Sequence, residues 1–445
     1  MVAKTRVSAC KQVFQEGRQQ HLLMIEAKTV TIEHNSVAKA AEKRDSRKGI
    51  VTEQHETKDI VIIGGGMVGA ATALGLAKLG LEVALVEAFE PEAFDASQPL
   101  DVRVSAISAA SEALLERLGA FDTLLGMRHV AYRGLETWEM EGCITRFHAS
   151  QIKAERLGHI VENRLVQLAL WQEFDNYPNL TLCCPARVGR MVRSCAGIEV
   201  SLDDGRVFDA RLLVGADGAN SRVRQWAGIG ISGWDYSQSC MLINIATECE
   251  EQDVTWQQFT PQGPRSLLPL PGKNASLVWY DDAKQIRSLM QLSDSQLKQA
   301  IINHFPDRLD PHFEVLAKGS FPLTRRHAQQ YYRDNLVILG DAAHTINPLA
   351  GQGVNLGFKD VEALIATITQ ALEKGEDWSK ATVLEGFQKQ RWFDNQLMMT
   401  GMDLFYAGFS NDLLPLKLLR NAGLKLADIN TPVKQQVLKY ALGLR

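Results

Sequence analysis

The feature that most constrains the fold is a set of three glycines, Gly64-x-Gly66-x-x-Gly69, directly after a short apolar run. That run, Asp59–Ile63 (DIVII), is rich in β-branched residues, which is typical of a strand buried on both faces of a parallel sheet. Small, helix-favouring residues follow the glycines, and Glu82–Val86 (EVALV) then repeats the buried-strand pattern. This order of strand, glycine turn, helix and strand predicts a βαβ unit.

The same glycines predict a dinucleotide site. Glycine permits a tight turn and lets the backbone N–H groups approach a pyrophosphate, and the N-terminus of the following helix adds partial positive charge. Glu87 ends the second strand, 18 residues after Gly69, where a carboxylate can accept hydrogen bonds from ribose hydroxyls. An ordinary tight turn is the alternative, and the surrounding strands and Glu87 disfavour it.

Two later segments carry related signals: LVGADGANSRVR (213–224) and LVILGDAAHTINPLAGQGVNLGFKD (336–360). Each places an aspartate beside a glycine at the end of a buried strand, the edge at which α/β sheets bind ligands. Asp341 can hydrogen-bond a polyol chain, and the glycines that follow it let the backbone approach a flat ring. A plain strand-end turn explains either segment alone, but three such elements in this order favour a cofactor site.

Composition narrows the class of protein. A chain of 445 residues can form about three domain-sized units or one large discontinuous fold. The net charge of -4 argues against a general nucleic-acid binder. The seven cysteines are scattered without a CxxC pair, which disfavours a metal site and fits a reducing compartment. We therefore expect a cytoplasmic location, no metal and no nucleic-acid partner.

The segments GGGMVG (64–69), GADGANSRVR (215–224) and GDAAHTINPLAGQGVNLGFKD (340–360) together resemble the signatures of the single-component flavin aromatic hydroxylases, the p-hydroxybenzoate hydroxylase-like group. The likeness runs from about Asp59 to Leu444. The last segment is similar to the ubiquinone-biosynthesis branch of that group. Within the branch, residues 255–270 and 401–411 are most similar to bacterial hydroxylases that act on a polyprenylated methoxy-methyl-benzoquinol.

The resemblance implies FAD as the cofactor. By position, the three glycines of the first motif would contact the pyrophosphate, and Glu87 the adenosine ribose. Asp217 would serve both FAD and NAD(P)H, Asp341 would hold the ribityl region, and 348–355 would line the isoalloxazine ring. The complete expected set is Gly64, Gly66, Gly69, Glu87, Arg103, Gln167, Asp217, Gly218, Gly340, Asp341, Pro348, Gly351, Gln352, Gly353 and Asn355.

The resemblance also implies a reaction. NAD(P)H would reduce FAD, O2 would give a C4a-hydroperoxyflavin, and an OH group would pass to a polyprenyl quinol ring. Three alternatives stay open: hydroxylation at another ring position, a flavin-bound component of the biosynthetic complex without turnover, and a quinone reductase that needs no O2. The expected apolar wall of the substrate pocket comprises Trp256, Phe259, Trp279 and Tyr280.

Catalytic side chains are less well defined. His344 and Tyr280 are the candidate acid–base groups, although a histidine beside a buried turn is more often a satisfied structural group. Arg325, Arg326 and His327 are candidates for docking NAD(P)H, with a solvated charged turn as the alternative.

The expected fold is α/β. A parallel-sheet, Rossmann-like FAD-binding domain would comprise 58–128, 157–230 and 325–395, and an antiparallel β-sheet substrate domain would be inserted at 129–156 and 231–324. A C-terminal helical tail would occupy 396–445, and 1–57 would be a disordered N-terminal extension.

Residues 401–426 alternate apolar blocks with Lys417, Arg420 and Lys425, which predicts an interfacial amphipathic surface. Packing of the apolar blocks against the protein's own core is the alternative. Because an octaprenyl tail is insoluble in water, we expect a peripheral contact with the inner face of the plasma membrane or with a ubiquinone-biosynthesis complex.

Overall fold

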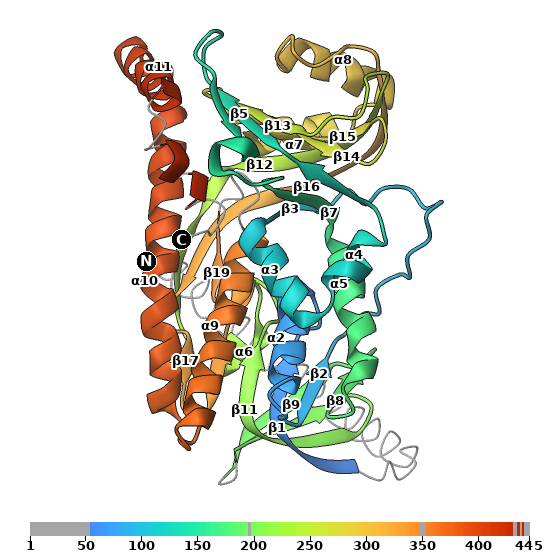
Figure 1. Ribbon diagram of the computed structural model, residues 1–445, viewed down its shortest axis with the longest axis vertical. Coiled ribbons are helices and arrows are strands. Elements are labelled where there is room, and N and C mark those ends of the chain that lie inside the picture. The colour runs from blue at the N-terminus through green and yellow to red at the C-terminus, as the bar shows by residue number, and fades with distance from the viewer. Residues whose placement is uncertain (1–53, 195–196, 347–352, 430–433, 437, 440–445) are drawn as a thin grey trace, which may run out of the picture. The chain divides into compact units, whose positions relative to one another are not determined.

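The computed structural model describes residues 54–194, 197–346, 353–429, 434–436 and 438–439 (Figure 1). Residues His55–Arg445 form one compact unit, to which the described helices and strands belong. Residues 1–53 lie outside the described residues. The first strand begins at Gln54, inside the segment expected to be an N-terminal extension.

A largely parallel sheet forms the first half of the architecture. Its strands, in spatial order, are β17 (Tyr332–Arg333), β18 (Leu336–Ile338), β11 (Arg206–Gly215), β1 (Gln54–Ile63), β2 (Val83–Val86) and β8 (Leu180–Cys183). The pairs β1–β2, β2–β8 and β11–β18 are parallel. Two further strands, β9 (Val188–Arg193) and β10 (Ile198–Leu202), extend β11 in antiparallel fashion.

The predicted βαβ unit is confirmed. Helix α2 (Met67–Ala77) follows β1, and every residue from Gly69 to Ala77 is buried. Its small side chains let it pack closely against α9 (Gly353–Glu373), which covers the same part of the sheet (Figure 1). The apolar strands read from the sequence are therefore buried on both faces, as parallel strands require.

An eight-stranded sheet forms the second half. Its strands, in spatial order, are β19 (His344–Thr345), β16 (Phe313–Ala328), β12 (Ile231–Thr247), β15 (Asn274–Asp282), β14 (Arg265–Leu270), β13 (Val254–Gln258), β5 (Gly134–Trp138) and β6 (Thr145–His148). The strand pairs are antiparallel except β13–β5, which is parallel.

The two faces of this sheet have different neighbours. Met241, Ile243 and Ile245 of β12 belong to a core shared with α7 (Ala283–Met290) and α8 (Asp294–His304). Asn244 points to the other face, where its Nδ2 donates to the carbonyl oxygens of Leu100 and Asp101, both at 3.1 Å. The second face of the sheet therefore meets the parallel-sheet half of the protein.

The segment from Tyr132 to Phe147, expected to be antiparallel strands, is divided between two sheets. Strand β4 (His129–Tyr132) joins a small sheet with β3 (Val104–Ser108) and β7 (Gly158–Glu162). Strands β5 and β6 pair with each other in the large sheet. Helices α3 (Ala109–Leu118), α4 (Phe121–Leu125) and α5 (Asn163–Gln172) lie beside the small sheet (Figure 1).

The chain after residue 353 is mostly helical, close to the expectation. Helix α9 is followed by α10 (Ala381–Phe409), which packs along it, and by α11 (Leu414–Ile429), which contacts β6. Within the described residues, no helix is both long and apolar enough to cross a lipid bilayer.

Candidate active site

The turns predicted to bind a cofactor lie at one edge of the parallel sheet. Strands β18, β11 and β1 are neighbours, so the turns after Ile338, Gly215 and Ile63 come together. The backbone N–H of Ala216 donates to the Ile63 carbonyl at 2.8 Å, and the N–H of Leu339 donates to the Gly215 carbonyl at 3.1 Å. Because β1 has β2 on one side and β11 on the other, this edge is the switch point at which such sheets bind ligands.

The glycines at this edge fall into two groups. Gly64 has φ +103°, and a β-carbon there would clash with the Ala216 carbonyl, while a β-carbon at Gly69 would clash with the Gly64 carbonyl. Gly64 and Gly69 are therefore required by the tight turn itself. At Gly66, Gly218 and Gly353, a β-carbon would meet no atom of the described residues within 4 Å, although Gly218 also has φ +79°, which itself favours glycine. Relative to the described residues these three positions border open space, as expected where a bound group approaches the backbone.

Two predicted residues converge on the first glycine turn. Glu87 accepts a hydrogen bond from the Gly65 N–H through Oε2 at 2.6 Å and from the Phe89 N–H through Oε1 at 3.0 Å. Gln167 donates from Nε2 to the Gly65 carbonyl at 3.0 Å, and Trp171 donates from Nε1 to the same oxygen at 2.9 Å. Sequence reasoning missed Trp171, which lies four residues after Gln167 and so shares its helix face.

Asp217 carries an unpaired polar atom. Its Oδ2 accepts hydrogen bonds from the N–H groups of Arg222, at 2.7 Å, and Val223, at 3.2 Å, which begin α6 (Arg222–Trp226). Its Oδ1 is buried and has no partner among the described residues. Burying an unpaired carboxylate oxygen is costly, and a ribityl or ribose hydroxyl is the kind of donor that would satisfy it. The residues present therefore fit FAD.

Asp341 lies exposed after Gly340, but burial by the surrounding protein raises the pKa of its carboxyl, against the opposing charges of His344 and Arg103. Asp341 follows β18 at the same sheet edge as the turns after β1 and β11. The predicted residues Pro348, Gly351 and Gln352 fall outside the described residues.

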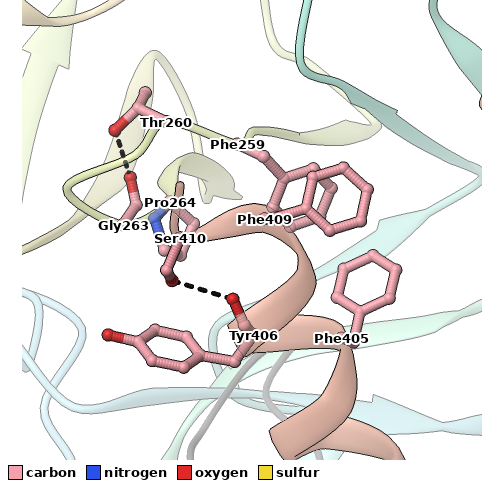
Figure 2. A pocket seen from close by; sticks show the side chains of 8 residues that line it. All are labelled: Phe259, Thr260, Gly263, Pro264, Phe405, Tyr406, Phe409 and Ser410. Carbon is pink, nitrogen blue, oxygen red and sulfur yellow. Dashed lines mark hydrogen bonds between the residues drawn. The ribbon is translucent and has the colours of Figure 1, made fainter. Parts of the chain in front are cut away.

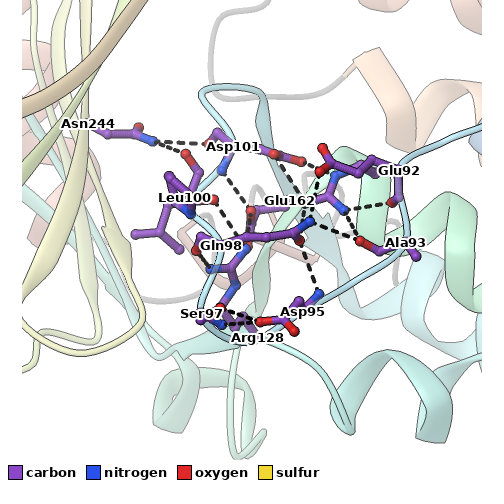
Figure 3. A network of polar contacts seen from close by, with 12 residues as sticks. Glu92, Ala93, Asp95, Ser97, Gln98, Leu100, Asp101, Arg128, Glu162 and Asn244 are labelled. Atoms are coloured by element: carbon purple, nitrogen blue, oxygen red, sulfur yellow. Dashed lines mark hydrogen bonds and ion pairs between the residues drawn. The ribbon is translucent and has the colours of Figure 1, made fainter.

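Arg103 lies between Asp341 and the large sheet. Its guanidinium lies 5.8 Å from the ring centre of Phe321 on β16. The loop before it is held by a polar network in which Asp101 donates its N–H to Glu162 at 2.7 Å and accepts from Arg164 at 2.9 Å (Figure 3). Together with Asn244, this network fixes the loop between the two sheets, and Arg103 with it.

The side chain of Asn355 is already fully engaged inside the protein. Its Oδ1 accepts from the Ser108 N–H at 3.0 Å and from the Ser111 hydroxyl at 2.8 Å, and its Nδ2 donates to the Ala106 carbonyl at 2.8 Å. The side chain therefore ties α9 to the junction of β3 and α3.

His344 belongs to a buried polar cluster centred on Asp360. The carboxylate of Asp360 contacts His344 Nε2 at 2.5 Å, the Gly340 N–H at 3.1 Å and Arg391 Nε at 2.8 Å. Burial alone would raise the pKa of Asp360, but His344 and Arg391 outweigh it and hold that pKa below its ordinary value. This occupied nitrogen favours the structural alternative for His344. Sequence reasoning missed Asp360 and Arg391.

The expected pocket wall is wrong for two of its four members. Trp279 packs on Phe305, with ring centres 5.4 Å apart, and Trp256 packs near Trp138 at 5.7 Å, in the core beneath α7 and α8. Successive strand residues point to opposite faces, so Tyr280 lies on the other face.

Tyr280 and Phe259 have surroundings of their own. Tyr280 is buried with Cys240 and Leu323, and burial holds the pKa of its hydroxyl well above the usual value. Phe259 contacts Phe405 and Phe409 at the end of α10, where a small recess opens between the strands and the helix (Figure 2). Of the expected wall, Tyr280 is the member on the face that meets the cofactor half of the protein.

The predicted charged turn at 325–327 is instead part of β16. Arg325 is buried and forms an ion pair with Asp403 at 2.6 Å, and His327 is buried against Tyr331 at 2.8 Å. Both the docking role and the solvated-turn alternative are therefore wrong for Arg325 and His327. Arg326, paired with Asp235, remains partly exposed.

This fold occurs in FAD-dependent monooxygenases of known structure. The p-nitrophenol 4-monooxygenase PnpA from Pseudomonas putida DLL-E4 superposes with a TM-score of 0.73 at 18% identity, covering 88% of this chain and 99% of that one. PqsL from Pseudomonas aeruginosa, described as a probable FAD-dependent monooxygenase, superposes with a TM-score of 0.69 at 22% identity, covering 83% and 99%. Residues 57–391 match the family model described as FAD binding domain, and the chain belongs to that family.

Sequence comparison with characterised proteins identifies the branch of the family to which the chain is similar. The chain is 51% identical over 390 residues to the Escherichia coli (strain K12) 3-demethoxyubiquinol 3-hydroxylase, covering 88% of this chain and all of the relative. It is 34% identical to the ubiquinone hydroxylase UbiL of Rhodospirillum rubrum, covering 91% and 94%. It is 31% identical to the human mitochondrial ubiquinone biosynthesis monooxygenase COQ6, covering 86% and 92%. The expected α/β fold, FAD-dependent monooxygenase activity and membership of the ubiquinone-biosynthesis branch are confirmed.

Proposed function

We propose that this chain hydroxylates the ring of a polyprenylated methoxy-methyl-benzoquinol, 3-demethoxyubiquinol, with O2 and NAD(P)H as co-substrates. The observation that carries the proposal is the open cradle at Gly66, Gly218 and Gly353, beside the unpaired Oδ1 of Asp217. The identity of 51% with a relative of that name, over the whole length of the relative, supports the choice of ring position.

Bound FAD would supply the hydride acceptance and oxygen activation that no side chain provides. The residues around the site have supporting tasks. The turn at 64–69 would hold the pyrophosphate, Glu87 would accept from the adenosine ribose, and Asp217 and Asp341 would accept from hydroxyls of the ribityl chain. Pro348, Gly351 and Gln352 stay in the proposal for the ring-binding segment by resemblance alone.

The quinol would lie against the face of the large sheet that carries Tyr280. The side chains of Cys240, Tyr280 and Leu323 are buried there, so this face can exclude water from the reacting ring. Tyr280 would not act as a base, because burial raises the pKa of its hydroxyl and the hydroxyl already contacts Cys240. The two ring oxygens already activate a quinol, so a dedicated base is unnecessary.

NAD(P)H would dock transiently, with Arg326 as the candidate contact. Of the three residues considered from sequence, it is the one whose side chain reaches the surface. The Michaelis constant for NADPH should rise on Arg326→Ala while FAD is retained. Arg190→Ala, which removes an exposed arginine on β9, is the matched control, and an unchanged Michaelis constant in Arg326→Ala would remove this contact from the proposal.

The proposal also includes a cytoplasmic location, contact with a membrane or a biosynthetic complex, and the domain division expected from sequence. Two boundaries of that division move: the described chain begins with β1 at Gln54, and β16 of the large sheet continues to Ala328. The tail of the substrate supports the membrane contact, because a long polyprenyl chain partitions into lipid.

Mass spectrometry of quinone intermediates in a strain that lacks the chain tests the ring position. The proposal predicts accumulation of the demethoxyubiquinone intermediate and its loss on complementation. Any other intermediate moves the reaction to another ring carbon. A non-catalytic flavoprotein would leave NADPH consumption by the purified protein independent of added quinol.

A further inference from the structure

Helix α11 directs its polar side chains toward the protein. Arg420 donates from Nε to Glu139 at 3.2 Å, and Asn421 donates from Nδ2 to the same carboxylate at 2.7 Å. Asn421 also accepts from the Met140 N–H at 3.0 Å. Farther along the helix, Asp428 accepts from the Arg146 N–H at 3.0 Å. These contacts fasten the polar side of α11 to the β5–β6 hairpin.

The leucines of the same region face away from the protein. We call Leu413, Leu414, Leu416, Leu418, Leu419 and Leu426 the leucine surface; their exposed fractions range from 44% to 69%. A surface helix of a globular protein normally has the opposite arrangement, with its apolar stripe toward the core. Because burial of a leucine side chain is favourable, an inverted helix of this kind indicates a further apolar contact.

The second half of α10 continues the apolar character. Phe393, Leu397 and Leu404 are exposed at helical spacing, with exposed fractions of 68%, 54% and 69%. Helices α10 and α11 lie along the same edge of the molecule (Figure 1). The exposed apolar side chains are therefore not confined to α11.

We propose that the leucine surface binds the surface of a phospholipid bilayer. Among the described residues, the large apolar side chains exposed on α10 and α11 are leucines together with Phe393 and Phe405, and they include none of the tryptophan or tyrosine anchors that dominate protein–protein interfaces. Helical backbone groups are satisfied internally, as a hydrocarbon environment requires. Lys425 is exposed beside Leu426 and can reach lipid phosphate groups.

This arrangement differs from the amphipathic surface expected from the sequence. Arg420 is one of the three cations of that expected surface, but its guanidinium is occupied by Glu139. Lys417 pairs with Asp412 at 2.9 Å. Aliphatic insertion, rather than a basic stripe, would therefore provide most of the attraction. The inference draws on the proposed function only for its purpose, the capture of a lipid-dissolved quinol.

Flotation with vesicles of phosphatidylethanolamine and phosphatidylglycerol tests the proposal on the full-length protein. The wild type should float with the vesicles, and the Leu418→Glu/Leu419→Glu double variant should lose at least about tenfold in partitioning. Leu316→Glu is the matched control, since Leu316 is an exposed leucine on β16 with an exposed fraction of 53%. That control should float like the wild type.

Several results would overturn the proposal. Equal flotation of wild type and double variant rejects it, as does absence of wild-type flotation. If light scattering shows an oligomer that the double variant splits, without vesicle binding, a second copy covers the surface. If the double variant lowers the melting temperature as a core substitution does, the chain's own residues cover it.

A soluble short-chain quinol separates this inference from the proposed function. Both the wild type and the double variant should hydroxylate it equally. Vesicle binding without hydroxylation leaves the leucine surface standing and rejects the function. Hydroxylation without vesicle binding supports the proposed function and rejects membrane binding by the leucine surface.

Discussion

Gly64 and Gly66 lie two residues apart in one turn and are glycines for different physical reasons. Gly64 has a positive φ, and a β-carbon there would clash with the Ala216 carbonyl, so the protein requires it with or without a cofactor. Gly66 has φ -65° at the start of α2, and none of the described residues occupies the space where its β-carbon would lie. The spacing of the motif could be read from the sequence, but this division of roles depends on where Ala216 lies and needed the structure.

Gly66→Ala should therefore separate folding from cofactor binding. We expect unfolding of the FAD-free protein to be nearly unchanged and FAD affinity to fall by about tenfold or more, because the methyl group enters the cofactor's space. Flavin fluorescence titration measures the affinity. Gly386→Ala, at an open position in α10, should leave it unchanged. Equal affinity in Gly66→Ala and wild type would contradict the assignment of the pyrophosphate site.

Asp360 anchors the turn at Gly340 through a charge that must stay ionised. Asp360→Asn should destabilise the protein by about 3 kcal/mol, because it leaves Arg391 buried without its charged partner. The folded pKa of Asp360 is depressed, so its contribution is complete above the ordinary aspartate pKa and is lost as the pH falls through the folded pKa.

Urea unfolding across pH measures this effect. The stability difference between wild type and Asp360→Asn should shrink as the pH falls below about 4. Asp394→Asn, a half-exposed partner of the same arginine, should cost much less. A cost for Asp360→Asn no larger than that for Asp394→Asn would show that the cluster does not hold the turn.

His327 should make the stability of the protein depend on pH in a second range, above that of Asp360. Burial lowers its pKa from 6.5 to about 4, so the unfolded chain binds the proton more readily than the folded protein. The free energy of unfolding should therefore fall by up to about 3 kcal/mol as the pH decreases from about 6.5 to about 4, because the folded protein keeps His327 neutral. His327→Gln should flatten this part of the pH profile. The exposed His312→Gln is the control, and an unchanged profile in His327→Gln would refute the assignment.

At the scale of elements, the strands with continuous apolar runs were predictable because both of their faces are buried by neighbours. Asp59–Ile63 and Glu82–Val86 were identified in this way, and β1 and β2 include them. The faces of β15 were not assigned correctly, because Trp279 and Tyr280 are equally apolar and only the position of α7 and α8 decides which one meets the cofactor half.

The orientation of α11 was equally inaccessible from sequence. Its alternation of leucines and cations predicts an amphipathic helix, but not which side the protein holds. Glu139, distant in sequence, decides that orientation by pairing with Arg420. Long-range ion pairs of this kind leave no local pattern.

Arg420→Ala should loosen α11 without unfolding the rest of the protein. The carboxylate of Glu139 is nearly fully buried. Without Arg420, that negative charge would keep only the neutral amide of Asn421 as a partner. Hydrogen exchange should accelerate in 414–429 and stay unchanged in β1 and β2. Lys425→Ala, an exposed cation of the same helix, should keep the wild-type protection. Unchanged exchange in α11 of Arg420→Ala would contradict the role of this ion pair.

At the scale of the whole molecule, the sequence predicted the two kinds of sheet and the helical end, because each has its own local pattern. It did not predict that the loop at Asp101 and Asn244 of β12 would join the two sheets, since that contact links residues more than a hundred positions apart. The location of Arg103, between Asp341 and Phe321 of β16, follows from this junction.

The central claim is that FAD at the edge of the parallel sheet directs one atom of O2 into a quinol ring on the neighbouring sheet. The most direct measurement supplies the purified flavin-loaded protein with NADPH, 3-demethoxyubiquinol and isotopically labelled O2, and determines the label in the product. The account predicts a hydroxylated quinol that carries one labelled oxygen atom. Consumption of NADPH with an unlabelled or unmodified quinol would contradict it.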